Sequence, residues 1–544
     1  MKFLKSISHR HWPILIVLPV FLLLFARNPF SIRTLIPNFE PFPDGFHYVT
    51  PARCMLAGFG RNLCREGRVL TPSVPPLYSW YLLPFFSINN DPRMFYFGNV
   101  ALSLSFVLIF YLLLKHLVAN KTLQALALFL LVTNYYFYWF PSLAMAENLL
   151  IPLFLACLYL LLRPVSYLRA IIFMVLASSL FGAKYSAAPI TLTYFVLYSA
   201  KMFQNRKSLP NFWKFALLLV AVGTTAFFLS GGSAILYQAA SLLQRVVFQE
   251  RLGLHTTSES ASAWISTVFV AKNFPLYLQA LTGGNIYTLW VNGSLVPKII
   301  AVVGMTSLVI GSFYGSFRTF CRSVLILFFV QIAFLSLFYS FESRYILYCI
   351  PIVLLAFVLF LQEGIKYFQH KVPKSFTKRI IPATALVVFL LYSIASGLRI
   401  KNQIMLNLRH AETPWWYLSV LDLNKYFATV EISNPVVITA INPFLVDYYA
   451  TRKYELLPLA NQQDFNTDEN DKSAVWGPND YTNLLLLYQQ KLLEGKEVYV
   501  AKYGLGHESD KIQAFQSIQD TFDLELVQSG CYDLCNLYQL HLQN

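Results

Sequence analysis

Charged residues are scarce in this chain. Asp, Glu, Lys and Arg make up 13% of its 544 residues, whereas hydrophobic residues make up 56%. A soluble domain carries about 25% charged residues. This deficit excludes a protein that is soluble along its whole length and predicts that most of the chain lies in a membrane.

A clustered basic region is also missing. The net charge is +15, but the Lys and Arg residues are distributed between apolar runs. Binding to nucleic acid expects basic residues gathered on one face. The distribution is instead that of loops in a membrane protein, and we expect no nucleic-acid partner.

A signal peptide is not indicated at the N-terminus. Lys2, Lys5 and Arg10 precede an apolar run from Trp12 to Ala26, but no clean small-residue cleavage site follows it. We therefore expect this segment to remain as the first membrane helix.

Apolar segments near the length of a membrane span recur along the chain. We predict a mainly α polytopic helical bundle of about 11 spans, at residues 12–28, 95–117, 122–141, 147–162, 166–183, 185–204, 211–230, 294–316, 323–341, 344–363 and 380–398.

Loop charges set the orientation of this bundle. With the N-terminus in the cytoplasm, every predicted inner loop is basic, whereas the outer connections after residues 141, 183 and 341 hold only Lys184 and Arg344. Cytoplasmic loops of membrane proteins are enriched in Lys and Arg. The pattern predicts a multi-pass protein of the cell membrane whose C-terminal segment is extracytoplasmic.

The first outer loop, about residues 27–94, breaks this rule because it contains several arginines. An anionic headgroup or phosphate would explain them, and plain solvation of a long loop is the alternative. Within it, Thr50-Pro51 and Gly58 predict the start and stop of a short surface helix. The apolar stretch Pro75 to Ile88 suits an interfacial or re-entrant piece better than a span.

The composition becomes polar from about residue 400. β-like runs at 436–441, 498–501, 524–527 and 537–540 alternate with helical patterns at 481–493 and 510–520. Alternating strands and helices predict a small α/β domain. We therefore divide the chain into a transmembrane domain at 1–399 and a soluble extracytoplasmic α/β domain at 400–544.

Cysteines on the predicted outer side are compatible with disulfides. Cys531 and Cys535 could form a bridge if the residues between them make a turn. Metal binding by this lone pair is disfavoured because no His lies beside it.

Four charged residues lie at the ends of apolar segments or in the first loop, all on the predicted outer side: Asp44, Glu147, Lys184 and Arg344. Charges at such positions are costly and usually functional. Structural explanations stay open: a Pro-Asp-Gly turn for Asp44, the helix dipole for Glu147, and contact with lipid headgroups for the two cations. Together the four indicate a site for an anionic ligand.

The motifs around these residues resemble the GT-C-fold glycosyltransferases, in particular the protein O-mannosyltransferases and the aminoarabinose transferases that act on lipid A. The resemblance is carried, in order, by Phe42-Pro-Asp44-Gly-Phe-His47-Tyr48, Ala52 to Gly58, Pro75-Pro-Leu-Tyr78, Met145-Ala-Glu147 to Pro152, Lys184-Tyr185 and Ser343-Arg344-Tyr345 with Pro351.

The resemblance implies transfer of a sugar from a polyprenyl-phosphate donor to a hydroxyl of a lipid, glycan or protein acceptor, with inversion. Asp44 would be the base, and Glu147 would position the acceptor or a metal. Substrate binding would fall to Tyr48, Lys184, Arg344, Tyr345 and Arg68.

The chain departs from the family at two positions. Val74 stands before Pro75 where many members have Lys, so Arg68, Lys184 or Arg344 would supply the missing phosphate contact. Gly45 follows Asp44, where the O-mannosyltransferases have an acidic pair, and this puts a protein acceptor in doubt.

The chemistry of such a donor makes few demands on the protein. A phosphate leaving group has a second pKa near 6, so a general acid is unnecessary and a divalent metal is optional. The alternatives are a transporter or flippase of lipid-linked saccharides, and a non-enzymatic assembly or sensor protein. A transporter would be expected to show internal repeats and interrupted helices in matching positions, and the sequence shows no such repeat.

Overall fold

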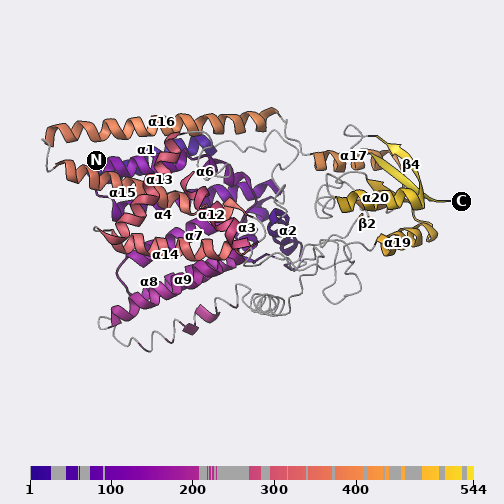
Figure 1. The fold of residues 1–544 in the computed structure, drawn as a ribbon, viewed down its shortest axis with the longest axis horizontal. Coiled ribbons are helices and arrows are strands. Elements are labelled where there is room, and N and C mark those ends of the chain that lie inside the picture. The colour runs from indigo at the N-terminus through magenta and orange to yellow at the C-terminus, as the bar shows by residue number, and fades with distance from the viewer. Residues whose placement is uncertain are drawn as a thin grey trace. The chain divides into compact units, whose positions relative to one another are not determined.

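The computed structural model of the chain forms two compact units (Figure 1). One comprises Met1–Phe39, Ser73–Thr257 and Ala261–Leu408, and the other comprises Glu40–Pro72, Ser258–Ser260 and Arg409–Asn544. The structure describes residues 2–25, 44–58, 60–61, 74–89, 92–206, single positions between 213 and 228, 269–283, 295–314, 317–338, 341–369, 374–409, 415–432, 435–439, 455–459, 481–501, 509–529 and 536–543.

The first unit is a bundle of helices. Its described helices are α1 (Lys2–Phe25), α3 (Leu77–Ile88), α4 (Phe95–Leu117), α5 (Lys121–Val132), α6 (Tyr135–Trp139), α7 (Glu147–Leu162), α8 (Tyr167–Ala183), α9 (Ala188–Gln204), α12 (Val270–Thr282), α13 (Leu295–Phe313), α14 (Arg318–Leu335), α15 (Cys349–Gln369) and α16 (Lys374–Arg409). Short 3-10 turns η1 (Pro92–Met94), η2 (Phe140–Ser142), η3 (Tyr185–Ala187) and η7 (Ser343–Ile346) lie between them.

Several of these helices can cross a membrane. In the described part of the chain, 5 are long and apolar enough by themselves, or up to 6 with one bent pair, and four shorter apolar helices accompany them. The multi-pass helical bundle is thus confirmed, and α4 and α7 have the predicted bounds. The count of about 11 stays a prediction, and most of the predicted span 211–230 lies outside the described residues.

The predicted span at 122–141 consists of two helical pieces, Lys121–Val132 and Tyr135–Ser142, with a bend of 56° between them. Asn134 starts the second piece: its side chain accepts hydrogen bonds from the backbone of Tyr136 and Phe137. The same side chain donates to the hydroxyl of Tyr392 at 2.8 Å. Asn is a favourable N-cap, and here it terminates one helix by initiating the next.

The predicted first outer loop contains a longer helix than predicted. Helix α2 (Asp44–Leu56) begins at Asp44, so Pro51 lies inside it and not in its first turn. The predicted stop is confirmed, since Gly58 has φ 84, a conformation that favours glycine. Helix α2 belongs to the second unit, whereas α3 packs against α4 and α8 in the first.

The C-terminal part of the second unit is a small α/β fold, as predicted. Strands β1 (Val436–Thr439), β2 (Glu455–Pro458), β3 (Val498–Ala501), β4 (Phe522–Gln528) and β5 (Leu537–Leu542) form a sheet in the order β2-β1-β3-β5-β4. The pairs of β1 with β2 and β3 are parallel, and those of β5 are antiparallel. Helices α17 (Trp415–Thr429), α19 (Tyr481–Leu493) and α20 (Ser509–Thr521) complete it.

The core of this α/β part is apolar, built from Val436, Ile438, Val500, Phe515 and their neighbours. Strand β2 was not predicted, since it is short and ends in a proline. The domain boundary at 399/400 stays a prediction, and α16 continues without a break to Arg409.

The described cysteines are of two kinds. Cys54 is disulfide-bonded, whereas the buried Cys157, Cys321 and Cys349 are free thiols. Cys64, Cys531 and Cys535 lie outside the described residues, so the Cys531–Cys535 bridge stays a prediction.

Candidate functional site

The segment before α7 is held by two buried asparagines. The side-chain amide of Asn99 donates to the carbonyls of Pro141 and Leu143 at 3.0 and 2.8 Å. Asn148 donates to Leu143 and to Met145 at 3.1 and 3.0 Å. These bonds tie the segment before α7 to buried side chains, and Glu147 follows as the first residue of α7.

Lys184 ends helix α8 in an extended conformation. The turn that follows it, η3, is held from another helix: the buried Gln331 of α14 donates its side-chain N–H to the carbonyl of Ser186 at 2.9 Å. Lys184 is therefore fixed from both sides, by the end of its own helix and by a contact to α14.

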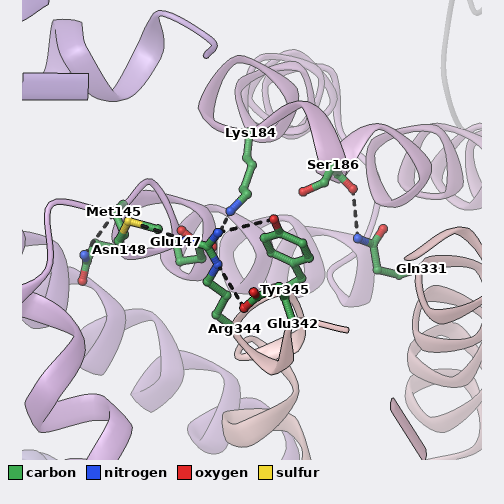
Figure 2. A network of polar contacts seen from close by, with 9 residues as sticks. All are labelled: Met145, Glu147, Asn148, Lys184, Ser186, Gln331, Glu342, Arg344 and Tyr345. Carbon is green, nitrogen blue, oxygen red and sulfur yellow. Dashed lines mark hydrogen bonds and ion pairs between the residues drawn. The ribbon is translucent and has the colours of Figure 1, made fainter. Parts of the chain in front are cut away.

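Glu147 and Lys184 form a buried ion pair between Oε1 and Nζ (Figure 2). Their side chains are 1% and 9% exposed. The second carboxylate oxygen of Glu147, Oε2, is also buried and has no hydrogen-bond partner among the described residues. A buried acceptor without a partner costs about 1–3 kcal/mol, so this oxygen is available to a hydroxyl brought by a ligand.

Arg344 and Tyr345 reach the pair from η7, which lies between α14 and α15. The Lys184 ammonium is 4.3 Å from the centre of the Tyr345 ring, and the Arg344 guanidinium carbon is 5.1 Å from it. Arg344 Nε lies 3.6 Å from Glu342 Oε2, and its Nη1 points to the sulfur of Met145 at 3.8 Å. Two cations thus lie near the Tyr345 ring (Figure 2).

The backbone beside Arg344 is held by α12. The N–H of Glu342 donates to the hydroxyl of Tyr277 at 3.3 Å, and Asn273 of the same helix donates to the carbonyl of Phe338. The two cations therefore rest on elements whose polar groups are bonded in the interior, which favours a preorganised site.

The structure brings together Glu147, Lys184, Arg344 and Tyr345, which the sequence places in three distant segments (Figure 2). Asp44 and Tyr48 belong to α2 in the second unit. Tyr48 is buried, while the Asp44 side chain and the whole of Arg68 lie outside the described residues. The roles assigned to all of these residues stay predictions.

Sequence reasoning missed the side chains that support the cluster: Asn99, Gln331, Tyr277 and Glu342. Asn99 and Gln331 are buried amides inside apolar helices. A polar residue within a span is a functional signal by itself, and this signal could have found both.

A metal site is not formed by the described residues. No group of three or more His, Cys, Asp or Glu side chains among them could hold a metal ion. Glu147 already faces the Lys184 ammonium, and this cation would repel a metal ion. The cluster is arranged to bind an anion, which Lys and Arg contact through charge-assisted hydrogen bonds.

Comparison with known proteins gives the fold. No family model and no curated protein sequence matches the chain. The crystal structure of ArnT from Cupriavidus metallidurans bound to undecaprenyl phosphate matches with a TM-score of 0.60 over 97% of both chains, at 12% identity. The apo structure of the same protein matches with a TM-score of 0.59 over 98% of both chains, at 14% identity.

The chain has the ArnT fold. ArnT is a lipid A aminoarabinose transferase with a GT-C fold, so the predicted GT-C-like fold is confirmed. The match covers nearly the whole chain, and it therefore includes both the helical bundle and the C-terminal α/β part. At this identity ArnT gives the fold, while the function must be argued from the site.

Proposed function

We propose that this protein is a membrane glycosyltransferase that moves a sugar from a polyprenyl-phosphate donor to an acceptor hydroxyl, with inversion at the anomeric carbon. The observation that carries the proposal is the buried cluster of Glu147, Lys184, Arg344 and Tyr345 in a chain with the ArnT fold. Undecaprenyl phosphate bound to ArnT supports a donor of this chemical class.

Lys184 and Arg344 hold the phosphate of the donor. Both cations lie on the face of Tyr345, and their present partners are carboxylates, Glu147 and Glu342. A phosphate can replace these carboxylates with equivalent charge-assisted bonds. As the bond from the anomeric carbon to the phosphate oxygen breaks, the two cations stabilise the charge that develops on the phosphate.

The acceptor is activated by a carboxylate. Its hydroxyl oxygen attacks the anomeric carbon, and its proton passes to Asp44 as the new glycosidic bond forms. The free Oε2 of Glu147 accepts a hydrogen bond from a second hydroxyl and orients the substrate. One displacement inverts the anomeric centre, whereas retention would require a covalent intermediate.

We place this reaction on the extracytoplasmic side of the cell membrane. The argument is the loop-charge bias, which assigns the basic connections to the cytoplasm and the ends that carry Glu147, Lys184 and Arg344 to the outside. In this proposal the transmembrane domain spans 1–399, and the α/β domain at 400–544 is extracytoplasmic.

Detection of a new glycoside distinguishes sugar transfer from transport of the donor. The purified protein in liposomes would be given a polyprenyl-phosphate sugar and lipid extract from a deletion strain, and the products followed by mass. We expect acceptor molecules heavier by one sugar residue. Movement of the donor across the bilayer without any new glycoside would establish the transporter alternative instead.

Donor binding tests the role of Arg344. Each lost charge-assisted contact is worth about 1.5–3 kcal/mol, so Arg344→Ala should weaken donor binding at least about tenfold. Arg163→Ala is the matched control, because Arg163 lies at the opposite end of α7 from Glu147. Equal donor affinity in the Arg344 variant and the wild type would leave Arg344 as a lipid-headgroup contact only.

Reporter fusions test the orientation. Reporters near residues 120, 207 and 374 should be cytoplasmic, and one at residue 450 should be outside, because the inner loops are basic. A cytoplasmic signal at residue 450 would contradict the common outer location of the site residues.

A further inference from the structure

Helices α13, α14 and α15 line a recess near the basic ends of α14 and α15, which are opposite to the ends that flank Arg344. Its volume is about 380 Å³, near the lower end of the ~300–1,000 Å³ typical of ligand pockets. Val302, Thr306 and Ile310 of α13 form one wall, and Leu359 and Phe360 of α15 form another. The lining is predominantly apolar, so its occupant must be largely hydrocarbon.

Two close contacts of α13 shape this recess. A Cβ on Gly304 would lie 2.5 Å from the carbonyl oxygen of Val353, so α13 and α15 touch through their backbones there. A Cβ on Gly311 would lie 2.7 Å from the sulfur of Cys321 in α14. Beyond these contacts the groove is bounded by Tyr314 and Phe317. It is therefore a defined pocket between three helices and not a flat lipid-facing surface.

The mouth of the pocket is positively charged. Glu363 lines the pocket, but it is paired with Lys366 at 2.6 Å. The Lys366 ammonium lies 5.8 Å from the centre of the Phe317 ring. Arg322 donates from Nε to the carbonyl of Ser312 at 2.8 Å, and Arg318 is exposed in the first turn of α14. Lys366 and Arg322 thus lie beside residues of the pocket and outnumber its one carboxylate, which favours an anionic headgroup at this end of the apolar groove.

We propose that this pocket is a binding site for an anionic phospholipid of the bilayer. One acyl chain lies between α13 and α15, and the phosphate group contacts Lys366, Arg318 and Arg322. The site is independent of the proposed glycosyl transfer, because it lies at the ends of α14 and α15 that are opposite to Arg344. It binds a lipid that is retained and not consumed.

Native mass spectrometry of the full-length protein tests this site with phosphatidylglycerol as the probe. We expect one phosphatidylglycerol per chain to survive a detergent wash that strips the remaining lipid. Thr306→Trp fills the groove from an exposed position and should abolish this retention. Ser105→Trp is the matched control, since Ser105 is exposed on α4 and does not line the pocket, and it should retain the lipid.

A variant of Lys366 tests the contact with the lipid headgroup. Lys366→Gln should reduce the preference for phosphatidylglycerol over phosphatidylcholine by about fivefold, the contribution of one cation near an anionic lipid. Lys115→Gln, an equal charge change at the end of α4, should leave the preference unchanged.

Several results would overturn the proposal. One is retention of phosphatidylglycerol by Thr306→Trp at the wild-type level; if that variant does not fold, Ile310→Trp, at a position 55% exposed, replaces it. A second is equal retention of phosphatidylcholine by the wild type. A third is retention of a polyprenyl phosphate in preference to phosphatidylglycerol, which would make the pocket a second substrate site.

Discussion

The helical bundle buries charged and amide side chains, whereas the described C-terminal α/β part buries few polar side chains. In the bundle, Asn99, Glu147, Lys184 and Gln331 are buried inside an apolar protein. In the described residues of the α/β part only Thr439 and Asn536 are buried polar side chains, and its ion pair between Lys491 and Glu455 is partly exposed. Buried charge is expensive, so its concentration in the bundle marks where binding and chemistry are expected.

The largest effect is expected for Asp44. A catalytic Asp44 would contradict this contrast, because it lies in α2, which belongs by its contacts to the second unit. Asp44→Asn keeps the size of the side chain and removes its capacity to accept a proton. General base catalysis contributes about 10²–10⁴-fold, so sugar transfer should fall by that factor while donor binding is retained. The measurement is transfer in membranes with equal amounts of folded protein. Near-normal transfer would move the catalytic assignment to Glu147.

Variants of the buried Glu147–Lys184 ion pair distinguish its contribution to stability from its role in donor binding. Lys184→Met leaves the Glu147 carboxylate buried without a cation, and breaking such a pair costs about 3–5 kcal/mol. The double variant Glu147→Gln with Lys184→Met removes both charges, so thermal stability should return close to the wild-type value. Donor binding should stay weak, because the phosphate has lost a cation. A double variant that binds donor normally would show the pair to be structural alone.

Gln331 tests whether the interior supports the site at a distance. Gln331→Leu removes the bond to Ser186 behind Lys184, and a neutral hydrogen bond is worth about 1 kcal/mol. We expect the KM for donor to rise about fivefold. Gln362→Leu is the matched control: Gln362 is also buried and accepts from the backbone of Ala119 at 2.7 Å, away from the site. Equal KM values for the two variants would assign Gln331 to packing only.

The smallest effect is expected in the α/β part. The hydrogen bond that Lys491 donates to Glu455 raises the pKa of Lys491, so the protonated amine is favoured in the folded state. This contribution is complete below the unfolded pKa of Lys and is lost as the pH rises through the higher folded value. A partly exposed pair is worth about 0–1 kcal/mol. Lys491→Met should therefore increase hydrogen exchange in β2 only slightly, and a large increase would reveal a pair more important than its exposure suggests.

Much of the fold could be predicted because membrane spans and strands leave a simple hydrophobic pattern. The limits of α4, α7, α19 and β3 coincide with the predicted ranges. The break between α5 and α6 was missed because Thr133-Asn134 is a short polar interruption, and only the capping bonds of Asn134 reveal its effect. The start of α2 was missed because Pro51 was assigned to the first turn.

The grouping of Glu147, Lys184 and Arg344 was foreseeable from loop charges, since residues on one side of a membrane share a thin layer. Their contacts were not foreseeable. The pairing of Lys184 with Glu147, its approach to Tyr345 and the support from Gln331 depend on how α7, α8 and α14 pack. Sequence periodicity assigns a residue to a helix end, but it does not say which helix end is the neighbour.

The position of the ion pair also has a consequence for how the chain enters the membrane. Glu147 begins α7 and Lys184 ends α8, and these consecutive helices pack against each other as a hairpin. Both are short apolar helices, and a lone charge carried into a bilayer costs about 2.5–3.5 kcal/mol on insertion scales. We expect the hairpin to close during synthesis, so that the ammonium and the carboxylate meet before α14 and α15 are made. Two marginal segments can then partition into lipid together, as one electrically neutral unit.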